Sequence, residues 1–108
     1  MKVKEKNNVI VLKKSSELIA DFVDKINEQL HICKDKNVII DFEDVTLRPA
    51  DILLFENIAA HQLEQKKSFV IIADIDFDEI DDNIIVVPTL QEGFDIIEME
   101  EIERDLGF

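Results

Sequence analysis

The spacing of hydrophobic and polar positions changes several times along the chain, and each change marks an expected element. Residues 2–6 alternate weakly between polar and apolar, and the Asn7-Asn8 dipeptide that follows suits a turn with positive φ. A stronger β-branched run at 9–13 comes next. The first thirteen residues therefore predict a hairpin whose outer strand is exposed.

Two later segments have apolar residues at helical spacing. The first follows a serine at 15 or 16 that suits a helix cap, and its expected buried stripe is Leu18, Ile19, Phe22, Val23, Ile26 and Leu30. The second covers residues 50–65, with an expected inward stripe of Ile52, Phe55, Ala59 and Leu63. Short apolar runs at 37–42, 68–75 and 83–88 predict strands covered on both faces, and residues 77–82 suggest one short helical turn.

A last helix is expected to run towards Gly107, because Thr89 and Glu92 have the spacing of a capping box. Short buried strands that alternate with helices are typical of parallel sheets with right-handed crossovers. We therefore expect one α/β domain over residues 1–108. It should contain a mostly parallel sheet of four to five strands, with an N-terminal hairpin and helices packed on the sheet.

The last helix has two apolar faces at about 100° per residue. The face expected to cover the sheet comprises Leu90, Phe94 and Ile97. The opposite face begins halfway along an acidic segment and comprises Ile96, Met99, Ile102 and Leu106. Either this second face is a contact surface rimmed by charge, or the helix bends so that both faces pack on their own domain.

The net charge of −13 is concentrated at one end of the chain. Residues 1–73 carry 11 Lys and Arg against 12 Asp and Glu, whereas residues 74–108 carry 13 acidic residues against Arg104 alone. Binding to nucleic acid or to an anionic membrane needs clustered cations and is not expected. A basic protein partner would complement this charge, although an acidic surface can also serve solubility alone.

The expected compartment is the cytoplasm. The chain has a single cysteine, Cys33, which fits a reducing environment. No apolar run reaches the roughly 18 residues of a membrane span, and the first residues lack the apolar core of a signal peptide.

The expected order of elements, together with the stretch VIIDFEDVTL at 38–47, resembles STAS domains, the family of bacterial anti-sigma factor antagonists. The resemblance covers most of the chain in element order and about ten residues in motif. It implies a regulatory module that binds protein partners, such as an anti-sigma-factor-like protein, through the start of its second helix. The positions so implied are Arg48, Asp51, Ile52 and Phe55.

The resemblance fails at the turn that opens this helix. Family members carry Asp-Ser-Ser/Thr-Gly, and the ungapped alignment places Pro49, Ala50, Asp51 and Ile52 there. Asp51 thus occupies the switch position, where it has no hydroxyl to phosphorylate. Asp51 either caps the helix by accepting backbone N–H groups, or acts as a fixed negative charge that partly mimics a phosphate.

A second resemblance concerns the C-terminus. The run VVPTLQEGFDIIEMEEIERDLGF looks like the end of short bacterial proteins that are encoded beside ribonuclease Z and sometimes share its name. That nuclease needs a His-x-His-x-Asp-His zinc cluster, whereas this chain has only His31 and His61, thirty residues apart. The resemblance therefore implies an accessory role in tRNA processing or a physical association with ribonuclease Z, and not the nuclease itself.

Catalytic chemistry has few candidates here. Six acidic residues between Asp74 and Asp82 lack the glycine and glutamate that a calcium EF-hand loop requires, and no Gly-rich phosphate loop exists. A small metal-dependent hydrolase using Asp74, Asp76 and Asp78 is the alternative from a different class. The leading hypothesis is a non-catalytic, constitutive STAS-like interaction module without a cofactor. Its second surface, at Met99, Ile102 and Leu106, would serve a partner or a homodimer.

Overall fold

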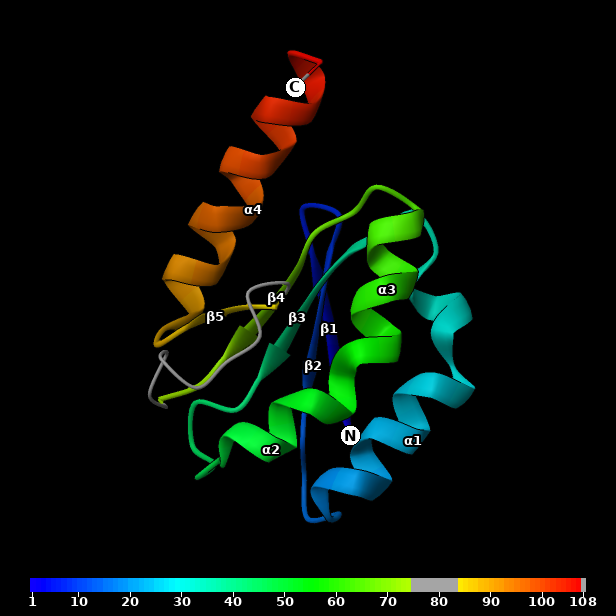
Figure 1. Cartoon of the computed structure of the whole chain (residues 1–108), viewed down its shortest axis with the longest axis vertical. Helices are drawn as coiled ribbons and strands as arrows, with labels where there is room; N and C mark the ends of the chain where they lie inside the picture. The colour runs from blue at the N-terminus through cyan, green and yellow to red at the C-terminus, as the bar shows by residue number, and fades with distance from the viewer. Residues whose placement is uncertain (75–83, 108) are drawn as a thin grey trace.

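A computed structural model describes residues 1–74 and 84–107 (Figure 1). The described residues form a five-stranded sheet in the order β1-β2-β3-β4-β5. The strands are β1 Lys2–Lys6, β2 Val9–Lys13, β3 Asn37–Asp41, β4 Phe69–Ile72 and β5 Ile85–Val87. β1 pairs with β2 in antiparallel fashion, and the remaining pairs are parallel. The mostly parallel α/β sheet and the N-terminal hairpin predicted from the sequence are thus confirmed.

The hairpin turn is made by Asn7 and Asn8, whose φ angles are 52° and 66°. Two consecutive positive φ values match the right-handed twist of the flanking strands, and asparagine tolerates them. β1 is exposed along its whole length, whereas β2 is buried up to Lys13. The lysines on this outer strand discourage edge-to-edge pairing with another sheet.

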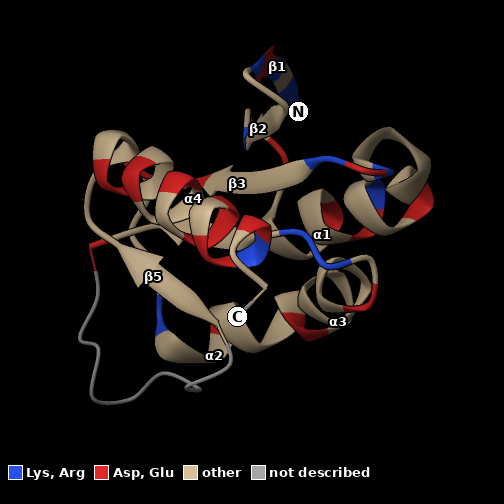
Figure 2. Ribbon diagram, turned by 90° about the horizontal axis from the view of Figure 1, so that it is seen from above, with Lys and Arg blue, Asp and Glu red and all other residues tan. Residues whose placement is uncertain are grey.

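The helices divide unequally between the two faces of the sheet (Figures 1 and 2). One face carries α1 Ile19–Glu28, η1 Leu30–Cys33, α2 Pro49–Ile52, η2 Leu53–Phe55 and α3 Glu56–Glu64. The other face carries α4 Leu90–Asp105. Right-handed crossovers between parallel strands place α1 and α3 on one side. α4 follows the last strand of the sheet and is free of that constraint, so it covers the opposite side.

The core beneath α1 and α3 is aromatic. Phe22, Phe42 and Phe55 are fully buried and meet edge to face, with ring centroids 5.6 to 6.5 Å apart. The core beneath α4 is smaller and aliphatic, and its buried members are Val9, Val11, Ile39, Val70, Ile72 and Ile97. The three residues expected to face the sheet from the last helix, Leu90, Phe94 and Ile97, all belong to or pack against this second core.

Two expectations about the helices are wrong. The N-cap residue of α1 is Leu18, and no side chain caps the helix, so neither serine has the expected role. Leu18 itself was expected in the buried stripe but is 73% exposed. The second helix is interrupted by the 3₁₀ turn η2, which advances about 120° per residue instead of 100°. This turn shifts the buried stripe, so that Ile58 and Gln62 face inward while Leu63 is 79% exposed.

α4 is held against the sheet at both ends. Near its start, a Cβ on Gly93 would lie 2.7 Å from Cδ1 of Ile72, so glycine permits the close approach. Near its end, Arg104 donates to Oγ of Ser68 at 3.2 Å and to Oδ1 of Asn37 at 3.3 Å. The amide of Asn37 in turn donates to Glu101 at 2.6 Å. Asn37 thereby joins the beginning of β3 to the last turns of α4.

α4 begins with the helix cap that the sequence predicted, since Oγ1 of Thr89 accepts the backbone N–H of Glu92 at 3.2 Å. The short helical turn expected at 77–82 lies outside the described residues, as does most of the acidic stretch 74–82. None of the helices in the described part of the chain is long and apolar enough to cross a membrane.

Candidate functional site: exposed surfaces on the helices

The junction between β3 and α2 fixes the position of Asp51. Pro49 occupies the first turn of α2, where its missing N–H leaves no donor unsatisfied. The Asp51 carboxylate accepts the backbone N–H of Arg48 at 3.0 Å, and the Arg48 guanidinium lies 3.4 Å from it. Asp51 is therefore a helix cap, as one of the two interpretations of the sequence expected. The other interpretation, a fixed charge at a switch position, stays a hypothesis.

Three of the four residues expected to contact a partner here are buried: Asp51, at 8% exposure, and the two apolar residues that follow. Ile52 and Phe55 are 1% and 0% exposed, so their side chains belong to the core and do not reach the surface. The exposed apolar residues of this turn are their neighbours Leu53 and Leu54, at 51% and 43%. At helical spacing these two leucines fall outside the inward stripe that contains Ile52 and Phe55, so their exposure agrees with the sequence pattern.

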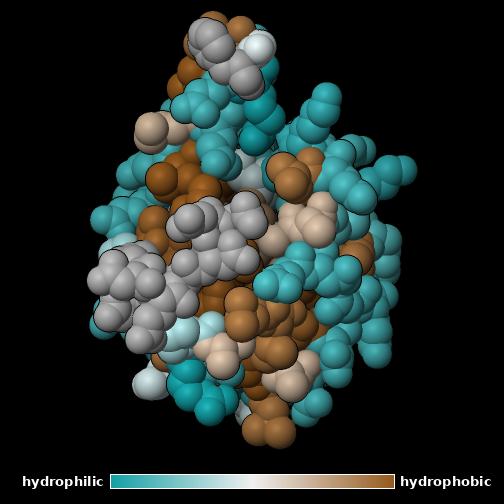
Figure 3. Space-filling view, in the orientation of Figure 1, coloured by the Kyte–Doolittle hydropathy of each residue, from teal (hydrophilic) through white to brown (hydrophobic). Residues whose placement is uncertain are grey.

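Leu54, in η2, shares an exposed surface with Leu18, the residue that precedes α1. Leu18 and Leu54 line a hollow of about 680 Å³ between α1 and α2, together with Arg48 and Thr46. Figure 3 shows apolar side chains gathered over α2 and at the start of α1, in the lower part of the molecule. We call the exposed residues Leu18, Leu53 and Leu54 the leucine patch.

The charges beside the leucine patch are compensated. Glu17 lies 2.8 Å from the Met1 ammonium group and 3.1 Å from Nζ of Lys25, and it also accepts the backbone N–H of Ser15. These contacts, above all the one with the ammonium group, lower the pKa of Glu17 to about 2. Glu17 is therefore paired rather than free to bind a partner, which leaves the apolar residues as the distinctive feature of this surface.

The outer face of α4 is the second exposed apolar surface. Met99, Ile102 and Leu106 are 57%, 53% and 65% exposed. Ile96, expected on the same face, is half-buried and packs on the core beneath α4. The exposed set is therefore shorter than the sequence predicted and occupies the second half of the helix.

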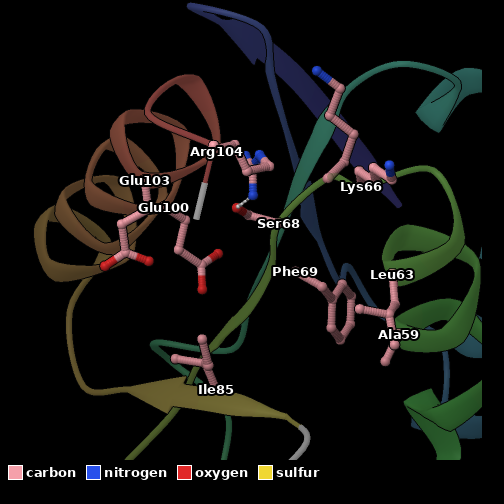
Figure 4. A pocket seen from close by; sticks show the side chains of 11 residues that line it. Ala59, Leu63, Lys66, Ser68, Phe69, Ile85, Glu100, Glu103 and Arg104 are labelled. Atoms are coloured by element: carbon pink, nitrogen blue, oxygen red, sulfur yellow. Dashed lines mark hydrogen bonds between the residues drawn. The ribbon is translucent and has the colours of Figure 1, made fainter.

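A further hollow of about 590 Å³ lies between α3 and α4 (Figure 4). Ala59, Leu63 and Phe69 form its apolar side, and α4 contributes Glu100, Glu103 and Arg104. The Arg104 guanidinium points at Ser68 and is bonded there. This hollow sits at the amino end of β4, whereas parallel sheets usually bind ligands at the carboxyl ends of their strands. Two of its polar residues, Arg104 and Ser68, are bonded to each other and help to hold α4 in place.

The candidates for nucleophilic and metal chemistry do not converge within the described residues. Cys33 is fully buried, and burial raises the pKa of its thiol, which disfavours the reactive thiolate. Nδ1 of His61 lies 3.1 Å from the side-chain oxygen of Gln62. Asp74 is exposed, while Asp76 and Asp78 lie outside the described residues. Over residues 1–74 and 84–107, no three His, Cys, Asp or Glu side chains gather as a metal site would require.

Comparison with models of known protein families and with curated proteins finds no match to this chain. The surfaces described above therefore carry the argument for function.

Proposed function

We propose that the protein is a non-catalytic, constitutive protein-interaction module with a STAS-like fold and a regulatory role. The single observation that carries this proposal is the leucine patch. Two of its leucines, Leu18 and Leu54, line the hollow between α1 and α2, and Leu53 is the exposed neighbour of Leu54 in the chain. Exposed apolar residues gathered in this way are typical of surfaces that a partner covers.

The STAS-like assignment rests on the order of elements and on the place of α2. In that family the partner contacts the start of the helix that follows the strand corresponding to β3. Here that start is fixed by the hydrogen bond between Asp51 and the Arg48 backbone. Asp51 offers no hydroxyl to phosphorylate, and its carboxylate already accepts the Arg48 backbone N–H. The start of α2 is therefore held in one conformation. This arrangement favours constitutive binding over a phosphorylation switch.

The partner's chemistry follows from the apolar patch and from the net charge. Leu18, Leu53 and Leu54 would be buried in the complex, and the Arg48 side chain, 80% exposed, stands beside them as a donor. The net charge of −13 would speed the encounter with a basic partner over longer distances. Contact specificity and encounter rate would then come from different parts of the molecule.

Affinity capture with quantitative mass spectrometry tests this proposal. The double variant Leu53→Asp with Leu54→Asp should lose a partner that the wild type retains, because two charges replace the apolar contacts. Both side chains are already exposed, so the fold should survive, and circular dichroism checks this. The matched control is Leu63→Asp, an exposed leucine on α3 away from the patch. A partner that is retained by the double variant, or lost equally with Leu63→Asp, would contradict the proposed surface.

A further inference from the structure

We infer that the outer face of α4 binds an amphipathic helix flanked by Lys and Arg, and that it rejects a second copy of this chain. This inference concerns a second surface and does not depend on the leucine patch. It rests on three properties of α4: the spacing of its exposed apolar residues, the acidic residues beside them, and the absence of ion pairs to those acids among the described residues.

The exposed apolar residues of α4 have the spacing of a helix-packing seam. Met99, Ile102 and Leu106 are separated by three and then four residues, so they fall on one stripe along the helix. Ile97 faces the opposite way into the core, which leaves this stripe pointing outward. Two turns of helix with alternating spacings of three and four match another helix better than an extended strand, whose side chains repeat every two residues.

The positions on both sides of the stripe are acidic. Glu98 and Asp105 border it on one side and Glu103 on the other, at the places where coiled coils carry the charges that select a partner. Figure 2 shows acidic residues along the whole of α4, with its one arginine near the end. That residue, Arg104, faces inward and donates to Asn37 and Ser68.

The carboxylates of α4 have no cationic partner in the described part of the chain. The ion pairs there engage Glu5, Glu17, Asp44 and Asp51, which all belong to other elements, and none involves α4. Glu98 lies three residues from both Asp95 and Glu101, so like charges are neighbours along the helix. Several of these acids also lie in the second half of α4, where the helix dipole disfavours negative charge. A partner that brings cations would relieve this repulsion.

A second copy would add to the repulsion. If two α4 helices packed along their apolar stripes, in either direction, acidic flanking residues would face acidic flanking residues. An anionic membrane surface or a nucleic acid would be repelled for the same reason. A helix with leucine-type residues at the seam and Lys or Arg beside them satisfies both the apolar stripe and the charges. The structure thus selects the chemistry of the partner as well as its shape.

Two synthetic probes test the inference by fluorescence anisotropy with the full chain. Both peptides are about three heptads long with the same leucine seam, and they carry either Lys or Glu at the flanking positions. We expect the wild type to bind the Lys peptide and not the Glu peptide. Raising NaCl from about 50 mM to about 500 mM should weaken this binding, since screening acts on exposed charges. Equal binding of both peptides, or binding of neither, would overturn the inference.

Three variants locate the surface. Met99→Gln with Ile102→Gln should weaken binding of the Lys peptide by about tenfold or more, because the seam loses its apolar contacts. Leu63→Gln, which changes a residue on α3 that is 79% exposed, should leave binding unchanged. Replacing Glu98, Glu103 and Asp105 by Lys should transfer the preference to the Glu peptide. Unchanged binding in the first and third variants would place the peptide elsewhere and refute the assignment to α4.

Analytical ultracentrifugation tests the rejection of a second copy. The wild type should sediment as a monomer at low salt. A dimer that dissociates in the Met99→Gln, Ile102→Gln variant would show that α4 packs on itself and would contradict the inference. The variant Leu53→Asp with Leu54→Asp should bind the Lys peptide like the wild type, so failure of the proposed function at the leucine patch remains distinguishable from failure at α4.

Discussion

The two faces of the sheet differ in which of their acidic residues form ion pairs. On the face that carries α1, α2 and α3, Glu17 and Asp51 lie within 4 Å of a cation, whereas the acids on α1 and α3 themselves form no ion pair among the described residues. On the face that carries α4, the described residues form no ion pair with the acids of that helix. Their cores differ too, since one contains a cluster of phenylalanines and the other is aliphatic. The contrast indicates that the aromatic core of the first face provides more of the stability, while that face also presents the leucine patch. The outer face of α4 retains an unfavourable charge pattern that suits recognition of a cationic partner.

A substitution in the aromatic core should have the largest effect on the free energy of unfolding. Phe55→Ala removes a fully buried ring that contacts Phe22, Phe42 and Phe69, and we expect unfolding free energy to fall by about 3–5 kcal/mol. Phe94→Ala removes a half-buried ring on α4, and it should lower the unfolding free energy clearly less. Urea denaturation measures both. Equal losses for the two variants would contradict the unequal roles given to the two faces.

The attachment of α4 should be separable from the rest of the fold. Asn37→Ala leaves the buried backbone N–H of Ser68 without its acceptor and removes the contacts to Glu101 and Arg104, so we expect a loss of about 1–3 kcal/mol. Hydrogen exchange should accelerate in the second half of α4 and not in α1 or α3. The control Asn27→Ala removes a surface hydrogen bond with Asn57 and one to the Val23 carbonyl of the same helix, and it should change stability by less than about 0.5 kcal/mol. Uniform acceleration across all helices would refute this separation.

The paired charges on the first face predict a pH dependence. The Met1 ammonium group, Lys25 and the Ser15 backbone hold the pKa of Glu17 at about 2, below its ordinary value of 4.5. A lowered folded-state pKa contributes stability that is fully present above pH 4.5 and is lost as the pH falls towards 2. Glu17→Gln should therefore flatten the stability profile between these values. If the variant and the wild type lose stability in parallel over that window, the ion pairs of Glu17 do not contribute.

The smallest expected effects have opposite signs on the two faces. Glu98→Gln removes like-charge repulsion with Asp95 and Glu101, and it should stabilise the protein by about 0.4–1 kcal/mol at low salt. Glu56→Gln removes a favourable charge from the first turn of α3, and it should destabilise by about 0.3–1 kcal/mol. Thermal unfolding at low and high salt measures both. Shifts of the same sign would contradict the electrostatic contrast.

Much of the fold could be predicted because its signals are local. The Asn7-Asn8 turn, the β-branched runs and the cap at Thr89 each depend on a few adjacent residues. The break at Leu53–Phe55 could not be predicted, since neither Gly nor Pro marks it. That one turn reverses the expected burial of Leu63, which is 79% exposed.

The position of α4 depends on contacts that are not local in sequence. Asn37, Ser68 and Arg104 belong to three elements and meet only in the folded chain, so no local pattern marks them as a unit. The exposed stripe of α4 could be anticipated from its spacing. The length of this stripe could not be anticipated, because the burial of Ile96 depends on the sheet beneath it.

The most direct test of the role given to α4 is backbone amide NMR during titration with the Lys peptide. We predict that shift changes concentrate at residues 98–106 and spare α1 and α3, with no comparable changes when the Glu peptide is added. Changes centred on the leucine patch or on the hollow between α3 and α4, with α4's outer face unaffected, would contradict the account.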